Sequence, residues 1–476
     1  MRTPSLFVAL TLTAGCVVHL PTQRVLVAER AASRIVIHDT SVFTATSTEV
    51  TPHHDVIVHR GRIEAILPAG TAPALPGDLT LDGRGKTLLP GLVDMHAHVT
   101  LSAAPPWYLA LPDVEHNLQA HLYAGVTTVN DLGGAVESLH DARRRIAEGD
   151  WLGPRLFFAG TYLTRDDGYP ASMLRLVYGK LAAWLTEDEL VTGVETPEAA
   201  ALAVRRHWAD GVTMIKIIVA ELPHGAPRLT PEQLDAIVAE AHGLGLKVAA
   251  HVDSLDDALL AAAHGVDWLA HGVVTSALSP ENAQRLAASG IIVAPTLAIY
   301  DNICQLVEQP YVVSPMKAAS EPPELLERFS ADDVRDAKLD PGFAKWIDAI
   351  ELNRAQRKKN ALALFQAGVP LVVGTDAQGA VATFAADIHE ELRLLVEAGI
   401  PNAEVLLGAT SRAARLLQAE PPFGTIEPGK SADLLLVDGD PLTDITATSR
   451  IAEVIVRGRL LTRAPENRAA GDVVER

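Results

Sequence analysis

The middle of the 476-residue chain alternates short apolar runs, of the length of buried strands, with stretches of helical pattern. One run, 212–219, precedes a helix opened by Thr230-Pro231-Glu232, where proline suits the first helical position. Further strand-like runs occupy residues 247–251, 268–271, 291–296 and 370–376. Strands that alternate with helices predict parallel βα units. The pattern is typical of an α/β fold of the (β/α)₈ TIM-barrel type, which commonly takes about 250 residues.

Short alternating strands at both ends of the chain predict a second, smaller domain. The pattern covers residues 34–38, 55–59 and 62–67 near the start, and 432–437 and 452–456 near the end. Each group is too small to form a stable sheet alone. We therefore expect one small β-sandwich built from both chain ends.

The expected domain boundaries follow from these patterns. They are 24–88 and 420–465 for the two parts of the β-sandwich, and 89–419 for the barrel. Within the barrel, residues 301–366 form a long charged segment that reads as helical. Because this segment lies between the last two predicted strands, it is a candidate cap over an active site.

Composition limits the classes of function. Hydrophobic residues make up 48% of the chain and charged residues 21%, so a large core is expected. The net charge of −19 makes nucleic acid a poor partner, because an acidic surface repels phosphates. Cys16 and Cys304 are the only cysteines, which excludes a cysteine-built zinc site and a disulfide framework. A metal would therefore be held by histidines, carboxylates or a less usual ligand.

The first 20 residues predict an export signal. Arg2 supplies a positive start, and the apolar run 6–12 is too short to span a bilayer as a mature helix. The run Thr13-Ala14-Gly15-Cys16 resembles the bacterial lipoprotein box, although Thr13 departs from its usual leucine. We therefore expect an exported protein that is periplasmic or membrane-anchored through a lipid on Cys16.

Polar residues stand where the predicted barrel strands end, and that is where barrels carry their chemistry. His96 and His98 follow the apolar run 88–93, and residues two apart on a strand share a face. His251, His271 and Asp376 end three other strands. Neutral imidazoles and a carboxylate are good ligands for zinc and similar ions. The set predicts a metal centre.

Lys216 lies inside the otherwise apolar run 212–219. A buried ammonium is costly, and it would repel cations held by neighbouring strands. Two arrangements relieve this cost. Lys216 forms an ion pair with a barrel carboxylate, or it reacts with carbon dioxide to give a carbamate whose oxygens bridge a metal pair.

The ordered ligand set and three further motifs resemble the amidohydrolase superfamily, nearest to its imidazolonepropionase-like and Xaa-Pro dipeptidase-like branch. The motifs are LPGLVDMHAH (89–98), AGVTTV (124–129) and GTIEPGKSADL (424–434). The resemblance covers nearly the whole mature chain. It implies two divalent ions, expected to be Zn²⁺. One ion would be held by His96, His98 and Asp376, the other by His251 and His271, with carboxylated Lys216 (N6-carboxylysine) as the bridge.

The implied activity is metal-dependent hydrolysis of an amide C–N bond in a small-molecule substrate such as a dipeptide or an N-acyl amino acid. A hydroxide between the ions would attack, and Asp376 would take its proton and pass it to the departing amine. Tyr162, Arg165, Tyr169 and His389 are the candidate substrate contacts. The loops around them depart from the relatives' pattern, so the resemblance does not carry a substrate identity.

Two alternatives stay open. The first is a cyclic-amide hydrolase with one metal, as in imidazolonepropionase, against which Lys216 argues because one ion needs no bridge. The second is a non-catalytic, exported metal-binding lipoprotein, against which Asp376 argues because pure binding needs no proton shuttle.

A homo-oligomer is also expected, since barrels with side sandwiches often pair. His116 and His121, five apart on one helix, are expected to be core or surface residues.

Overall fold

The computed structural model describes residues 25–464, except 31, 103, 105–109, 173–188, 223–224, 309–310, 330–340 and 379–382. The predicted export signal and Cys16 lie outside these residues. Two parallel sheets occupy the middle of the chain. One runs β7-β8-β9 and the other β11-β10-β12-β13-β14-β15. Their bounds are β7 Leu92–Ala97, β8 Val126–Asp131, β9 Arg155–Phe158, β10 Tyr162–Thr164, β11 Val191–Gly193, β12 Met214–Ile218, β13 Lys247–His251, β14 Trp268–Leu269 and β15 Ile292–Val293.

The two parallel sheets meet through backbone contacts on both sides. On one side, β9 pairs with β8 of the first sheet. The chain then continues into β10, which begins four residues after β9 ends and pairs with β12 of the second sheet. On the other side the segment 370–377 lies between β15 and β7, with parallel bridges Val293–Leu371 and Ala97–Ala377. The amide of Asp376 also donates to the His96 carbonyl at 2.7 Å. The strand expected at 370–376 is therefore an irregular segment that still bonds to both neighbours.

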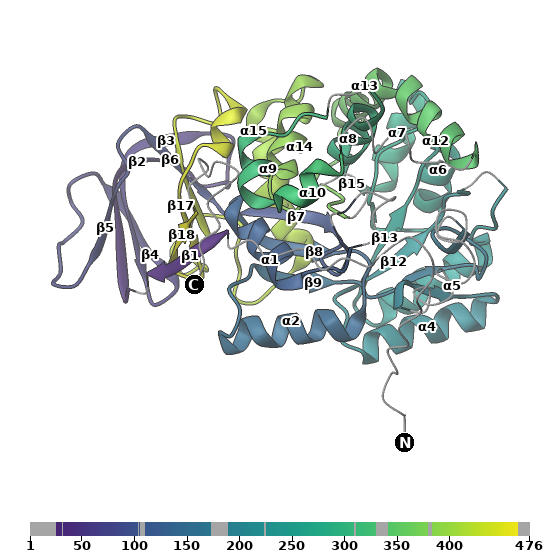
Figure 1. Cartoon of the computed structure of the whole chain (residues 1–476), viewed down its shortest axis with the longest axis horizontal. Helices are drawn as coiled ribbons and strands as arrows, with labels where there is room; N and C mark the ends of the chain where they lie inside the picture. The colour runs from purple at the N-terminus through teal and green to yellow at the C-terminus, as the bar shows by residue number, and fades with distance from the viewer. Residues whose placement is uncertain are drawn as a thin grey trace.

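Helices follow the strands, as the alternating pattern predicts, and cover the outside of the sheets (Figure 1). They are α1 Val114–Tyr123, α2 Val136–Glu148, α4 Pro197–Ala209, α5 Pro231–Gly243, α6 Leu255–Ala263, α7 Pro280–Ser289, α13 Arg354–Gln366, α14 Asp387–Glu397, α15 Asn402–Leu407 and α16 Ala413–Leu417, with a π-helical turn at Gly408–Arg412. The helix expected after Thr230 is confirmed, because the Thr230 and Gln233 side chains form a reciprocal capping box. Among the described residues no helix is long and apolar enough to cross a membrane.

The segment 301–366 is helical where it is described, as expected. It carries most of α8 (Leu297–Glu308), then α9 (Pro315–Ser320), α10 (Pro323–Glu327), α12 (Pro341–Leu352) and α13. A buried ion pair fastens it to the sheet-covering helices, with Lys317 Nζ 2.8 Å from Asp387 Oδ1 at the start of α14. Helices α8 and α9 thus pack on α14, and α8 also packs on α13.

Strands from both chain ends pair in one nine-stranded sheet and lie side by side in Figure 1. The order is β1-β18-β17-β16-β6-β2-β3-β4, with β5 on β2. The bounds are β1 Leu26–Arg30, β2 Arg34–Phe43, β3 Val50–His59, β4 Arg62–Pro68, β5 Leu79–Asp82, β6 Lys86–Pro90, β16 Leu434–Asp438, β17 Ile451–Val456 and β18 Arg459–Arg463.

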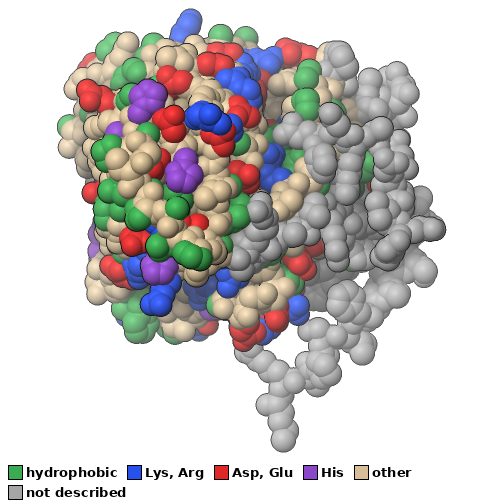
Figure 2. All heavy atoms as spheres, turned by 90° about the vertical axis from the view of Figure 1, so that its left-hand side faces the viewer, with side chains coloured by type: hydrophobic (Ala, Val, Ile, Leu, Met, Phe, Trp, Pro, Cys, Tyr) green, Lys and Arg blue, Asp and Glu red, His purple; other side chains and the backbone are tan. Residues whose placement is uncertain are grey.

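This sheet is one hydrogen-bonded path, whereas a sandwich has two separate sheets. Its two halves are joined where β6 pairs with both β2 and β16. They also face each other across one apolar core, in which Ile37 and Val58 pack with Leu434 and Ile455. On the face of the molecule that the small domain occupies, acidic, basic and histidine side chains are interspersed (Figure 2).

Glu391 on α14 accepts a hydrogen bond from the Ala298 amide at the start of α8, at 2.7 Å. Burial raises the pKa of its carboxyl to about 8, against the pull of the amides it faces. The folded chain therefore holds this proton above the unfolded pKa of about 4.3. Between about pH 4.3 and 8 the free energy of unfolding is expected to fall by roughly 1.4 kcal/mol per pH unit from this group.

Urea unfolding at pH 5 and pH 8 measures this dependence. Glu391→Gln keeps an acceptor for the amide and should remove the fall, whereas Glu390→Gln, a change at the neighbouring half-buried carboxylate, should retain it. Equal pH dependence in Glu391→Gln and the unchanged protein would contradict the assignment.

Candidate metal centre

Four histidines and Asp376, which lie far apart in sequence, converge inside the parallel sheets. The Nε2 atoms of His96 and His98 lie 3.2 and 3.1 Å from Asp376 Oδ1, and that of His271 lies 4.0 Å from Oδ2. The His271 ring lies 4.8 Å from the His96 ring and 4.4 Å from the His251 ring, between centroids. Among the described residues, His96, His98 and Asp376 are the one group of His, Cys, Asp or Glu whose ligand atoms all lie within 4.8 Å of one another.

Three of the histidines are oriented through their other ring nitrogen. His96 Nδ1 lies 2.9 Å from the Ala270 carbonyl and His98 Nδ1 lies 2.8 Å from the Gly133 carbonyl. Because a carbonyl only accepts, each Nδ1 carries the proton and each Nε2 keeps its lone pair free. His271 Nδ1 lies 2.8 Å from the Thr296 hydroxyl. Such partners fix the tautomer and the ring direction that a metal ligand needs.

Lys216 occupies the middle of β12, in register with Ala249 of β13, and is 1% exposed. Its Nζ has no hydrogen-bond partner and no carboxylate oxygen within 4 Å among the described residues. The ion pair that the sequence left open is thus not formed in this part of the chain. Burial lowers the pKa of the Lys216 ammonium to about 7, although Asp376 opposes the shift.

Burial also keeps the imidazoles neutral. It lowers the pKa of His96, His251 and His271 well below the usual value, and Lys216 adds to the shift for each. The Nε2 atom of His251 is buried without a partner. Neutral, buried imidazoles with free lone pairs beside a carboxylate form a donor set that suits a divalent cation.

Asp94 holds the segment that carries Asp376 against β7. Its carboxylate accepts from the Thr375 amide and hydroxyl at 3.0 and 2.6 Å, and from the His96 amide at 3.0 Å. His121 Nε2 lies 3.7 Å from the same carboxylate, so this residue, set aside in the sequence, supports the centre from behind. Close packing here requires Gly374, because a Cβ at this position would lie 2.8 Å from His96 Cβ.

Asp376 itself has φ +56°, a left-handed conformation that few non-glycine residues adopt. Backbone strain of this kind clusters at functional sites. The irregular course of residues 370–377 thus follows from Gly374 passing close to His96 and from the turn at Asp376.

Three buried or half-buried tyrosines frame the histidines. The Tyr162 hydroxyl lies 3.1 Å from His98 Nδ1, and the Tyr169 ring lies 5.0 Å from the His251 ring. Both were predicted to contact substrate, and the structure places both at the centre. The third, Tyr300 on α8, lies edge-on to His271 at 5.8 Å between ring centroids. Sequence reasoning missed it, because its helix lies in a segment that gives no local signal of a site.

The other two predicted substrate contacts have partners of their own. Arg165 pairs with the Glu195 carboxylate through both its Nε and its Nη2. His389 bonds to the Thr448 hydroxyl and to the Ala124 carbonyl, each at 3.0 Å. Since Ala124 precedes β8, His389 lies at the opposite ends of the strands from the metal ligands. The orientation of α14, which the sequence pattern does not give, decides this.

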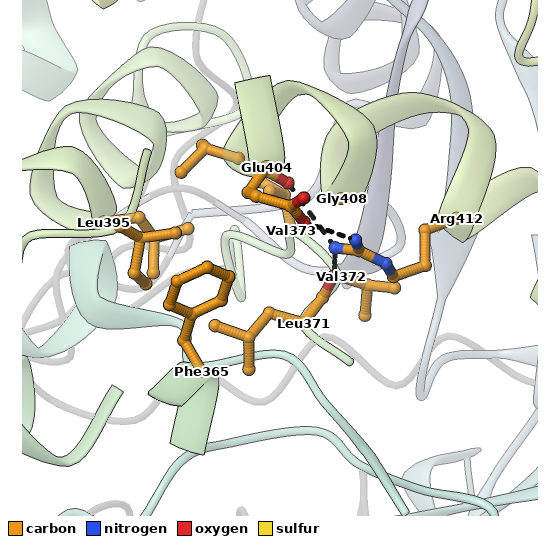
Figure 3. A pocket seen from close by; sticks show the side chains of 10 residues that line it. Phe365, Leu371, Val372, Val373, Leu395, Glu404, Gly408 and Arg412 are labelled. Atoms are coloured by element: carbon orange, nitrogen blue, oxygen red, sulfur yellow. Dashed lines mark hydrogen bonds and ion pairs between the residues drawn. The ribbon is translucent and has the colours of Figure 1, made fainter. Parts of the chain in front are cut away.

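A small pocket elsewhere contains none of these residues. It is lined mainly by apolar side chains, with Phe365, Leu371 and Leu395 on one side (Figure 3). Arg412 closes the other side by donating to the Leu371 carbonyl at 2.7 Å and to Glu404 at 2.8 Å. The charged side chains that line this pocket, Arg412 and Glu404, pair with each other. We therefore place the candidate site at the histidine cluster.

A histidine, lysine and aspartate cluster at the carboxyl ends of parallel strands defines the class of metal-dependent hydrolases. The chain belongs to the amidohydrolase family, whose model matches residues 87–461. It is 26% identical over 435 residues to the imidazolonepropionase of Rubrobacter xylanophilus, covering 87% of this chain and 92% of that one. It is 27% identical over 394 residues to an uncharacterised Mycobacterium tuberculosis protein, covering 82% and 88%.

Solved structures share the fold. A Xaa-Pro dipeptidase with methionine bound in its active site matches with a TM-score of 0.70 and 24% identity, over 91% of this chain and 100% of that one. A prolidase complexed with N-methylphosphonate-L-proline matches with a TM-score of 0.69 and 24% identity, over 90% and 100%. The family membership makes the protein a hydrolase, and the family generally binds divalent metals.

Asp94→Asn is expected to weaken divalent-metal binding by about 10- to 100-fold, because the amide cannot hold Thr375 and His96 together. Metal titration of the purified protein measures this. Asp55→Asn is the matched control, since Asp55 is a buried carboxylate that accepts three amides in the nine-stranded sheet. Both changes should lower the free energy of unfolding, but only Asp94→Asn should weaken metal binding. Equal metal affinity in the two variants would refute the role of Asp94.

Proposed function

We propose that the protein is a binuclear metal-dependent hydrolase that cleaves an amide C–N bond in a small substrate such as a dipeptide or an N-acyl amino acid. The observation that carries the proposal is the burial of Lys216 without a partner among the described residues, beside four buried histidines and Asp376. An ammonium in that place has no counter-ion in this part of the chain, whereas a carboxylated lysine supplies an anion where cations are to be held.

The donor set fits two ions. His96, His98 and Asp376 would hold one, and His251 and His271 would hold the other, which gives the orphaned Nε2 of His251 a partner. When bound, the ions would supply activated water and polarise the substrate carbonyl. We expect zinc, which imidazole and carboxylate ligands suit, although such sites accept several divalent ions.

Lys216 would bridge the pair as N6-carboxylysine. The neutral amine attacks carbon dioxide, one N–C bond forms, and one proton leaves for solvent. The product is a carbamate anion, whose two oxygens would lie where Lys216 Nζ has no hydrogen-bond partner among the described residues. Formation of this carbamate removes a buried cation that would otherwise repel both ions.

Asp376 is the residue placed to move a proton. Its Oδ1 lies within 3.2 Å of two imidazoles, and Gln378 Nε2 also donates to it at 3.1 Å. At this position Asp376 would accept the proton of the attacking water and deliver it to the leaving nitrogen, so that the amine departs neutral. Its left-handed backbone aims the carboxylate at the histidines rather than along the strand.

The relatives support a small amide as substrate. Their names include Xaa-Pro dipeptidase and prolidase among the solved structures, and imidazolonepropionase among the sequences. The last supports the second candidate, a single-metal cyclic-amide hydrolase. We favour the binuclear reading because one ion leaves Lys216 without a function. The retained Asp376 weighs against a protein that only binds metal.

Three further properties belong to the proposal. The ring of β7, β8, β9 with β10 as one strand, β12, β13, β14, β15 and the segment 370–377, with β11 outside the ring, closes as a (β/α)₈ barrel. The N-terminal 20 residues direct export to the periplasm, with a lipid on Cys16 as the anchor. Chains associate as homo-oligomers.

Metal analysis of the purified protein tests the central claim. We expect about two divalent ions per chain, together with turnover of a dipeptide or N-acyl amino acid from a screened library. Lys216→Ala should remove most of the metal and the activity, with partial rescue by short-chain carboxylates. Asp376→Asn should lower turnover by several orders of magnitude while it retains more metal than Lys216→Ala.

Two results would overturn the claim. Unchanged activity in Lys216→Ala would remove the bridging role. One ion per chain, with turnover of a cyclic amide and none of an open amide, would establish the single-metal alternative instead.

Export is tested separately. Expressed in a Gram-negative host, the full-length chain should appear in the membrane fraction facing the periplasm, and Cys16→Ser should release it from the membrane fraction. Recovery of both forms in the cytoplasm would exclude the signal.

A further inference from the structure

Tyr300 is a side chain of the centre to which neither the ligand set nor the sequence assigns a role. It lies on the first turn of α8, four residues after Thr296, whose hydroxyl faces His271 Nδ1. Its ring approaches the His271 ring edge-on at 5.8 Å between centroids. The residue is 3% exposed. A helix that starts beside a metal ligand thus carries a phenol over the same ligand.

The Tyr300 hydroxyl has no hydrogen-bond partner among the described residues. The other buried tyrosines differ in this respect. Tyr162 bonds at its hydroxyl to His98, and Tyr123, at the junction with the nine-stranded sheet, donates to the Ala464 carbonyl at 3.1 Å. The hydroxyl is not among the fully buried polar atoms that lack a partner, so it remains accessible. An accessible hydroxyl without a protein partner can donate a hydrogen bond to a bound ligand. At this position the ligand would be the substrate.

The Tyr300 phenol lies beside the His271 ring. An ordinary phenol has a pKa of about 10, so its hydroxyl carries a proton at neutral pH. A protonated phenol near the proton-shuttling carboxylate donates a hydrogen bond and does not act as a base.

Arg357 on α13 stands behind the Tyr300 ring, with its Cζ 5.4 Å from the ring centroid. The residue is 4% exposed, and no carboxylate lies within 4 Å of its guanidinium among the described residues. The guanidinium donates to the Ile350 carbonyl and lies 3.5 Å from Cys304 Sγ. A buried cation held by neutral groups beside a phenol ring fixes the ring and makes its hydroxyl a stronger hydrogen-bond donor.

We propose that Tyr300 is a catalytic hydrogen-bond donor to the substrate carbonyl oxygen, and that Arg357 is a positioning residue that acts through Tyr300. The proposal rests on the proposed amide hydrolysis at the same centre. As water adds to the carbonyl carbon, the oxygen becomes an oxyanion, and the phenol hydrogen bond strengthens at that point without transfer of its proton. Donors aimed at a developing oxyanion are among the largest contributions to catalysis.

Tyr300→Phe tests the donor, with Tyr123→Phe as the matched control, since it removes a buried hydroxyl bonded elsewhere. In the zinc-loaded protein, kcat for the substrate found in the library should fall about 100-fold in Tyr300→Phe, with metal content unchanged. The affinity for methylphosphonate, a tetrahedral mimic of the oxyanion, should fall at least tenfold by calorimetry. Tyr123→Phe should leave both values within twofold.

The measurement of methylphosphonate binding distinguishes a failure of this inference from a failure of the proposed function. If no amide is hydrolysed but Tyr300→Phe still weakens methylphosphonate binding, the substrate class is wrong and the donor stands. If amides are hydrolysed and Tyr300→Phe matches the unchanged protein in both measurements, the donor is wrong and the hydrolase stands.

A double-mutant cycle tests Arg357. Arg357→Met should weaken methylphosphonate binding in the presence of Tyr300 and have little further effect in the Tyr300→Phe background, with partial recovery in Arg357→Lys. Additive losses in the cycle would show that Arg357 acts on the fold and not through Tyr300.

Discussion

The metal centre depends on one physical constraint, the removal of polar side chains from water at the carboxyl ends of parallel strands. Lys216 illustrates it most clearly, because its amine is buried in the middle of β12 without a counter-ion among the described residues. The same burial keeps His96, His251 and His271 neutral. Polar groups buried in this way cost the folded chain stability, a cost that bound divalent cations would offset under the proposed function.

Backbone groups hold the cluster in place as much as side chains do. The carbonyls of Ala270, after β14, and of Gly133, after β8, decide which nitrogens of His96 and His98 face the centre. Asp94 bonds to the backbone on both sides of the contact between β7 and the segment 370–377. Because these partners belong to the sheet itself, the geometry of the ligands follows from the register of the strands. A register shift of one residue would turn the ligand side chains to the outer face.

Much of this centre could be predicted from the sequence, because strand ends carry a local signal. His96, His98, Lys216, His251, His271 and Asp376 each end or interrupt an apolar run, and parallel strands bring such positions together. The mistakes concern residues on helices and loops. The orientation of α14 places His389 against Ala124, and the pairing of Arg165 with Glu195 depends on two loops meeting. Tyr300 was missed for the same reason, since its role depends on how α8 leaves β15. The segment 370–376 lies where a strand was expected, but it is not a regular strand, because its backbone bends at Gly374 and Asp376.

Selectivity among amide substrates is expected to come from the side chains that surround the candidate metal ligands. Metal ligands on a rigid sheet fix where water and a carbonyl meet, but they do not distinguish one amide from another. Under the proposed function that distinction would fall to Tyr162 on β10, Tyr169 in the loop that follows it and Tyr300 on α8. Tyr300 and the Arg357 behind it come from α8 and α13, and the neighbouring α9 is joined to α14 by the buried pair Lys317–Asp387. Under this proposal, substrate preference is expected to change in these segments while the ligand set remains the same.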